Sequence, residues 1–197
     1  MIQTELIASI PELLRRHARA QPAKIAYTDA GGEISYGALA TKTANLAGHF
    51  QALGIEPRER VAMLLPNSIA WIQSCLALAR AGAISVPIAY EAALPEIAYR
   101  LADAGCRALI TTDEHMARLQ PLLADASALE HVILCARGAR HPQGHRFADL
   151  IDQAPGLAPR DPEMLDEPAF IIYTSGTTGR AKDDERLIAR ARHRVRG

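Results

Sequence analysis

The chain has 197 residues, of which 49% are apolar and 22% are charged, with 22 basic residues against 22 acidic ones. This length is sufficient for one α/β domain, and the composition is typical of a globular protein and excludes extensive disorder. The balanced charge provides no overall attraction to nucleic acid or to an anionic membrane, so we expect neither as a partner.

The chain shows no targeting or membrane segment. Its start, MIQTELIASIPELL, carries an acid and a proline and lacks the uninterrupted apolar stretch of a secretory signal. The longest apolar region, residues 70–90, is interrupted by Gln73, Arg80, Gly82 and Pro87, so no membrane span is expected. We therefore expect a cytoplasmic protein.

The first elements predicted are a helix, a hairpin and a second helix. Apolar residues at helical spacing indicate a helix over residues 10–20. Two short strand patterns, residues 24–29 and 33–36, flank a Gly-Gly turn and predict a hairpin. Residues 37–54 again have helical spacing and end at a glycine, which is a common helix stop.

Strands and helices then alternate along the chain. The predicted strands are continuous apolar runs at residues 60–65, 83–88, 107–112 and 131–135. The predicted helices between them are residues 69–82, 94–105 and 114–126, the last capped by Asp113 and kinked or split at Pro121. Alternation with buried strands predicts an α/β fold, a largely parallel sheet with helices on both faces.

Residues 136–167 are rich in Gly, Pro and charge and are interpreted as a surface excursion, with a short helix at residues 147–151. His141 and His145 are four residues apart, but the intervening Pro and Gly favour a solvated loop over a metal site. Four acids in the same region are interpreted as a solvated face, with a Mg²⁺ site as the second alternative: Asp161, Glu163, Asp166 and Glu167.

The three cysteines, Cys75, Cys106 and Cys135, are far apart and form no CxxC pair. We interpret them as small buried residues in a reducing compartment. A catalytic thiol stays open as the alternative, although no neighbouring residue type indicates one.

A Gly- and Thr-rich loop follows the last predicted strand, residues 169–173, and reads TSGTTGRAK. Its glycines let backbone N–H groups approach phosphate oxygens, while its hydroxyls and its lysine add donors and a positive charge. The predicted phosphate-binding residues are Thr174, Ser175, Gly176, Thr177, Thr178, Gly179 and Lys182. The loop is not an ATPase P-loop, because an alanine precedes the lysine and Asp183 follows it.

Residues 173–182, YTSGTTGRAK, resemble the phosphate-loop signature of the adenylate-forming (AMP-binding) superfamily, which includes acyl-CoA synthetases, luciferases and peptide-synthetase adenylation domains. Residues 34–88 and 99–114 are also similar to the amino-terminal region of that family, so the resemblance covers roughly residues 10–182. Residues 86–105 look more like acyl- or aryl-CoA ligases than amino-acid-activating domains.

The resemblance implies a ligase reaction. A carboxylic acid, fatty or aromatic, attacks the α-phosphate of ATP to give an acyl-adenylate, and coenzyme A then displaces AMP. ATP, Mg²⁺ and coenzyme A are implied as cofactor and co-substrates, with the loop holding the β and γ phosphates. No catalytic residue and no metal ligand of this chain is assigned, and the acid is not identified.

The resemblance stops after Lys182, where three acids replace the family's Gly and apolar run. We therefore divide the chain into a truncated amino-terminal AMP-binding domain, residues 1–182, and a divergent Arg-rich tail, residues 183–197. In the tail, Leu187, Ala191 and Val195 would share one face of a short helix. We interpret the tail as the product of a frameshift or a broken gene, and a segment that binds nucleic acid or a membrane surface is the less favoured alternative.

The family's acyl pocket, adenine and ribose contacts and mobile carboxy-terminal domain have no counterpart in these residues. The chain is therefore expected not to be competent alone. The alternatives are a non-catalytic nucleotide-binding remnant and one half of a split protein with a complementing chain.

Overall fold

The computed structural model describes residues 9–123, 128–135, 144–162, 168–173 and 186–190, the last as backbone only. The elements along the chain are α1 (Ile10–Ala20), β1 (Ile25–Asp29), β2 (Gly32–Ser35), α2 (Tyr36–Ala52), β3 (Arg60–Leu64), α3 (Ile69–Ala81), β4 (Ile84–Pro87), α4 (Leu94–Ala104), β5 (Ala108–Thr111), α5 (Asp113–Leu123), β6 (His131–Leu134), β7 (Gly144–Arg146), α6 (Phe147–Asp152), β8 (Pro168–Tyr173) and β9 (Arg186–Arg190).

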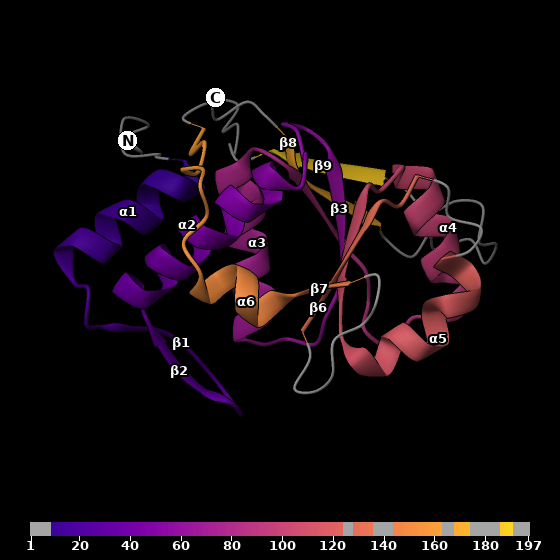
Figure 1. The fold of residues 1–197 in the computed structure, drawn as a ribbon, viewed down its shortest axis with the longest axis horizontal. Helices are drawn as coiled ribbons and strands as arrows, with labels where there is room; N and C mark the ends of the chain where they lie inside the picture. The colour runs from indigo at the N-terminus through magenta and orange to yellow at the C-terminus, as the bar shows by residue number, and fades with distance from the viewer. Residues whose placement is uncertain (1–8, 124–127, 136–143, 163–167, 174–185, 191–197) are drawn as a thin grey trace, which may run out of the picture.

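A mostly parallel sheet forms the centre of the molecule, which confirms the predicted α/β fold. Its seven described strands have the order β7-β6-β5-β3-β4-β8-β9, and only the β8–β9 pair is antiparallel. Strands β1 and β2 form a separate antiparallel hairpin, as predicted. Helices α1, α2 and α3 lie on one side of the sheet and α4 and α5 on the other (Figure 1).

The two faces of the sheet follow from the alternation of side chains along each strand. In β3, Val61 and Met63 pack with α2 and α3. The intervening Ala62 and Leu64 pack with α4, α5, β4 and β8. Because both faces are buried, the strand reads as one apolar run, which is why its sequence carries no polar alternation.

Helix ends are set by short polar side chains and by glycines. The hydroxyls of Ser9, Ser35 and Ser68 accept hydrogen bonds from the first turns of α1, α2 and α3. Gly82 and Gly105 end α3 and α4 with φ of +76° and +59°, a conformation that a side chain disfavours.

The cap predicted for α5 is one residue out. The hydroxyl of Thr112, not the carboxylate of Asp113, accepts the hydrogen bond from the backbone N–H of His115, at 3.4 Å. Asp113 is instead the first helical residue, where its charge still suits the positive end of the helix dipole. The helix continues through Pro121 to Leu123.

Two loop predictions need correction. The excursion after β6 does contain the predicted short helix, α6, but residues 144–146 form β7, which pairs in parallel with β6. His145 therefore lies on a strand, while His141 lies outside the described residues. In the tail, residues 186–190 form β9 against β8, so a helix through Leu187 is wrong there. No helix in the described ranges is long and apolar enough to cross a bilayer.

Candidate functional site

The predicted phosphate loop begins at the end of β8. Tyr173 is the last residue of that strand, and all seven predicted binding residues, Thr174 to Gly179 and Lys182, lie outside the described residues. Because β8 runs parallel to β4, the chain leaves the sheet at the edge where β3, β4 and β5 also end. Strands β4 and β5 flank β3 on opposite sides, which makes this edge a topological switch point, where open α/β sheets bind ligands.

Side chains of α4 surround Tyr173. Its hydroxyl donates a hydrogen bond to Oδ2 of Asp103 at 2.5 Å, and only 7% of the residue is exposed. The guanidinium carbon of Arg100 lies 5.3 Å from the centre of the Tyr173 ring. The ring of Tyr99 meets it edge-on, with the two centroids 6.3 Å apart. The residue before the predicted loop is thus held on several sides.

A second polar cluster lies at the same edge, where β4 and β5 end. The hydroxyl of Tyr90 lies 3.3 Å from Oγ1 of Thr112 and donates to Oε2 of Glu114 at 3.2 Å. Nε2 of His115 lies 2.8 Å from the backbone carbonyl oxygen of Tyr90, so this nitrogen carries the proton and donates. The His115 ring, 2% exposed, packs on Tyr90 with centroids 4.3 Å apart, which fixes the loop after β4 against α5.

Sequence analysis missed this cluster, because nothing in the spacing of Tyr90 and His115 links them. Two buried atoms there, Nδ1 of His115 and Oγ1 of Thr111, have no hydrogen-bond partner among the residues that the structure describes. A strand end followed by Thr-Thr-Asp is the single local signal that could have drawn attention to this edge.

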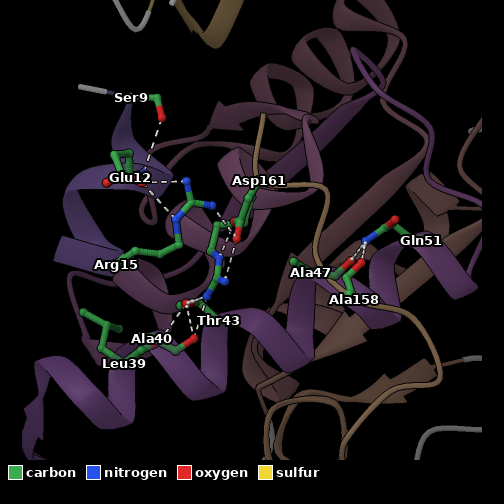
Figure 2. A network of polar contacts seen from close by, with 11 residues as sticks. Ser9, Glu12, Arg15, Leu39, Ala40, Thr43, Ala47, Gln51, Ala158 and Asp161 are labelled. Atoms are coloured by element: carbon green, nitrogen blue, oxygen red, sulfur yellow. Dashed lines mark hydrogen bonds and ion pairs between the residues drawn. The ribbon is translucent and has the colours of Figure 1, made fainter. Parts of the chain in front are cut away.

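A third group, Asp161 with two arginines, contradicts the predicted solvated acidic face. Arg80 donates to both carboxylate oxygens of Asp161, at 2.7 and 3.0 Å. Figure 2 shows Arg15 directed toward the same carboxylate, 3.0 Å from one of its oxygens. Arg80 also donates to the carbonyl oxygen of Ala40 and to Oγ1 of Thr43. The prediction was wrong for Asp161 because both arginines come from distant helices; Glu163, Asp166 and Glu167 lie outside the described residues.

The electrostatics of this group favour an ionised carboxylate. Burial raises the pKa of Asp161, but hydrogen bonds and charge from Arg80 and then Arg15 outweigh it and leave the pKa below its usual value. Only 6% of the Arg80 side chain and 13% of the Asp161 side chain are exposed. The group ties α1, α2 and α3 to the segment that leads to β8.

Cys75, Cys135, His131 and His145 lie in buried or half-buried surroundings. Burial raises the pKa of Cys75 to about 12, and burial with the Asp113 charge raises that of Cys135 to about 12, which supports the interpretation of both as unreactive thiols. The His131 and His145 rings lie 5.7 Å apart, and burial and then the neighbouring His131 lower the pKa of His145. Among the described residues, no group of three or more His, Cys, Asp or Glu could hold a metal ion.

A protein-family model described as AMP-binding enzyme matches residues 14–183, a range that includes β8 and the whole predicted loop. The chain belongs to the AMP-binding enzyme family. It is 35% identical to a feruloyl-CoA synthase of Amycolatopsis sp, over 85% of this chain and 31% of that enzyme. It is 34% identical to an indoleacetate–CoA ligase of Aromatoleum aromaticum, over 88% of this chain and 34% of that enzyme.

Solved structures of AMP-binding enzymes agree with the fold. The anthranilate CoA ligase AuaEII, solved with anthranoyl-AMP, superposes with a TM-score of 0.81 at 24% identity, covering 91% of this chain and 35% of that one. The chain therefore spans about a third of the length of the relatives it matches.

Proposed function

We propose that this chain provides the ATP-binding loop of an AMP-forming acid–thiol ligase. In this proposal, the backbone N–H groups and hydroxyls of Thr174 to Gly179, together with the Lys182 ammonium, hold the β and γ phosphates. The observation that supports the proposal is the family match, which covers residues 14–183 and so includes the predicted loop. Strand β8 also ends at the edge of the sheet that carries the switch point, which supports the proposal.

The proposed reaction has two steps. A carboxylate oxygen attacks the α-phosphorus of ATP, and the bond from this phosphorus to the oxygen that bridges to the β-phosphate breaks. The products are an acyl-adenylate and free pyrophosphate. The coenzyme A thiol then attacks the acyl carbon and expels AMP. The loop serves the first step, because donors aimed at the β and γ phosphates neutralise the charge of the departing pyrophosphate. Mg²⁺ is proposed to accompany ATP, as the family resemblance implies.

The substrate is proposed to be an aromatic or fatty carboxylic acid, used in the cytoplasm. The names of the two similar ligases, which act on feruloyl and indoleacetate groups, support the aromatic alternative. The 197 residues on their own are proposed to bind ATP without completing adenylation, since they span about a third of those enzymes. The remaining candidates are a non-catalytic nucleotide-binding remnant and a split protein with a complementing chain.

Titration with ATP, with and without Mg²⁺, tests the loop. Lys182→Ala removes the proposed phosphate charge, and Arg180→Ala is the matched control, because it removes a neighbouring charge that the proposal does not use. We expect Lys182→Ala to weaken ATP binding at least tenfold, on the order of one hydrogen bond to a charged group, and Arg180→Ala to change it less than about threefold. Equal effects of the two substitutions, or no ATP binding by the unaltered chain, would contradict the proposal.

ATP–pyrophosphate exchange tests competence separately. The unaltered chain is incubated with ATP, labelled pyrophosphate and ferulic, benzoic or a long-chain fatty acid in turn. We expect ATP binding without exchange. Robust exchange with any of these acids would show that the 197 residues are competent alone, and the acid that supports it would name the substrate class.

A further inference from the structure

We propose that Tyr173 and Asp103 form a positioning pair, which fixes the start of the ATP-binding loop against α4. The inference rests on the proposed function of that loop and adds two residues that the loop sequence does not contain. Tyr173 lies on β8 and Asp103 lies in the last turn of α4, 70 positions earlier in the chain.

The strand that carries the loop is buried on one face at its end. Ile171 and Tyr173, at 1% and 7% exposure, face the cluster that includes α4, whereas Ile172 points the other way and is 38% exposed. Contacts with α4 therefore determine the register of the last residues of β8 and the face of the sheet to which their side chains point. A slip of one residue would turn Tyr173 away from α4 and redirect the loop that follows.

The Tyr173 side chain is fixed at its hydroxyl and over its ring. The hydroxyl donates to Oδ2 of Asp103 at 2.5 Å, and the Arg100 guanidinium lies over the ring, 5.3 Å from its centre. Arg100 is itself held by Glu96, one turn earlier on α4, at 2.6 Å. Because Tyr173 is the last residue of β8, a fixed tyrosine fixes the point at which the chain leaves the sheet.

Asp103 occupies a position that local helix chemistry disfavours. It lies one residue before the end of α4, where the helix dipole is negative, and the last turn of α4 itself contains no basic residue. Arg60 of β3 donates to the carbonyl oxygens of Ala104 and Gly105 at this helix end. The hydrogen bond from Tyr173 gives the Asp103 carboxylate a partner on β8. A phenylalanine would fill the same space on β8, so the hydroxyl and the carboxylate are what distinguish a positioning pair from ordinary packing.

The test compares Tyr173→Phe with Tyr99→Phe in the 197-residue chain. Both substitutions remove one phenolic hydroxyl from the same pair of rings, but Tyr99 is 40% exposed and its ring only meets Tyr173 edge-on. Affinity for ATP with Mg²⁺ is measured at a temperature where circular dichroism shows each variant fully folded. Under that condition, a purely structural loss of stability leaves the affinity unchanged.

We expect Tyr173→Phe to weaken ATP binding roughly three- to tenfold, less than the loss of a direct hydrogen bond to the phosphates because Tyr173 acts through the loop, and Tyr99→Phe to leave it within about twofold. Asp103→Ala should match Tyr173→Phe, and Asp103→Asn, which keeps an accepting oxygen, should restore most of the affinity. Because Asp103 is exposed, its variants keep the test available even if Tyr173→Phe folds poorly.

The outcomes separate this inference from the function on which it rests. An unaltered chain that binds no ATP would overturn the proposed function, and the pair with it. An unaltered chain that binds ATP, with Tyr173→Phe and Asp103→Ala at the same affinity, would overturn the positioning pair alone and leave the loop assignment standing.

Discussion

The two faces of the sheet are stabilised by different means. The face covered by α4 and α5 combines apolar packing between the strands and their connecting helices with polar contacts such as Tyr173–Asp103 and Tyr90–His115. The opposite face carries, over α2 and α3, an additional crossing segment, residues 153–162, which is fastened by polar contacts (Figure 1). Apolar periodicity is visible in a sequence, whereas polar contacts between segments about 80 to 110 residues apart are not.

The crossing segment adds side-chain hydrogen bonds at the carboxyl ends of α2 and α3. Gln51 donates to the carbonyl oxygen of Ala158 at 2.8 Å. Arg160 donates to the carbonyl oxygens of Ile55 and Ala81, at 3.0 and 3.2 Å. The Asp161 carboxylate accepts a hydrogen bond from Arg80. The segment thus joins the carboxyl ends of α2 and α3 to the entrance of β8.

The largest effect should come from Asp161→Ala. This change leaves Arg80, with 6% of its side chain exposed, facing Arg15 without their shared carboxylate. Removing one partner of a buried ion pair leaves an uncompensated charge, and we expect the free energy of unfolding to fall by about 3 kcal/mol in urea denaturation.

Asp152→Ala is the control for that change. Asp152 pairs with Lys42, but 58% of its side chain is exposed, so its removal should cost less than about 1 kcal/mol. Similar losses for both aspartates would mean that the buried group contributes no more than a surface ion pair, and the contrast between the two faces would disappear.

Gly48→Ala tests how closely the crossing segment contacts α2. A Cβ at this buried helical position would lie 2.2 Å from the carbonyl oxygen of Leu157 and 2.4 Å from Cγ of Pro155, so the segment must move. Alanine favours the helix by about 1 kcal/mol, but overpacking costs more. We expect a net loss of about 1–2 kcal/mol of unfolding free energy.

Gly156→Ala, in the same segment, is the matched control, because a Cβ there meets nothing within 4 Å. It should leave the unfolding midpoint in urea nearly unchanged. A Gly48→Ala variant as stable as the unaltered chain would indicate that the segment lies loosely over α2 in solution.

Most of the fold could be predicted from the sequence, because each element carries a local signal. Continuous apolar runs identified β3, β4, β5, β6 and β8, and glycines at 82 and 105 marked the ends of two helices. Strand β7 was missed because its three residues, Gly-His-Arg, carry no apolar pattern and are paired only through the backbone. The tail strand β9 was missed for a related reason: it owes its form to pairing with β8.

The site could be predicted only in part. The loop residues are contiguous, so their composition alone indicates phosphate binding. The residues around the loop are not contiguous: Asp103 reaches Tyr173 across 70 positions, and His115 reaches Tyr90 across 25. Such contacts depend on how α4 and α5 cross the sheet, and no periodicity in one sequence records that geometry.

The smallest expected effect is a pH dependence that only the face with the crossing segment should show. The pKa of Asp161 is lowered by Arg80 and Arg15 despite its burial, so in acid the unfolded chain takes up a proton before the folded chain does. The stability from this carboxylate is therefore full above the ordinary aspartate pKa of 3.8 and is lost as pH falls through the lower, folded value. Asp161→Asn has no titrating carboxylate at this position. The difference in unfolding free energy between this variant and the unaltered chain should therefore become smaller as the pH falls from about 6 to about 3. A deficit that stays constant over that range would mean that Asp161 contributes to stability through shape and hydrogen bonding and not through its charge.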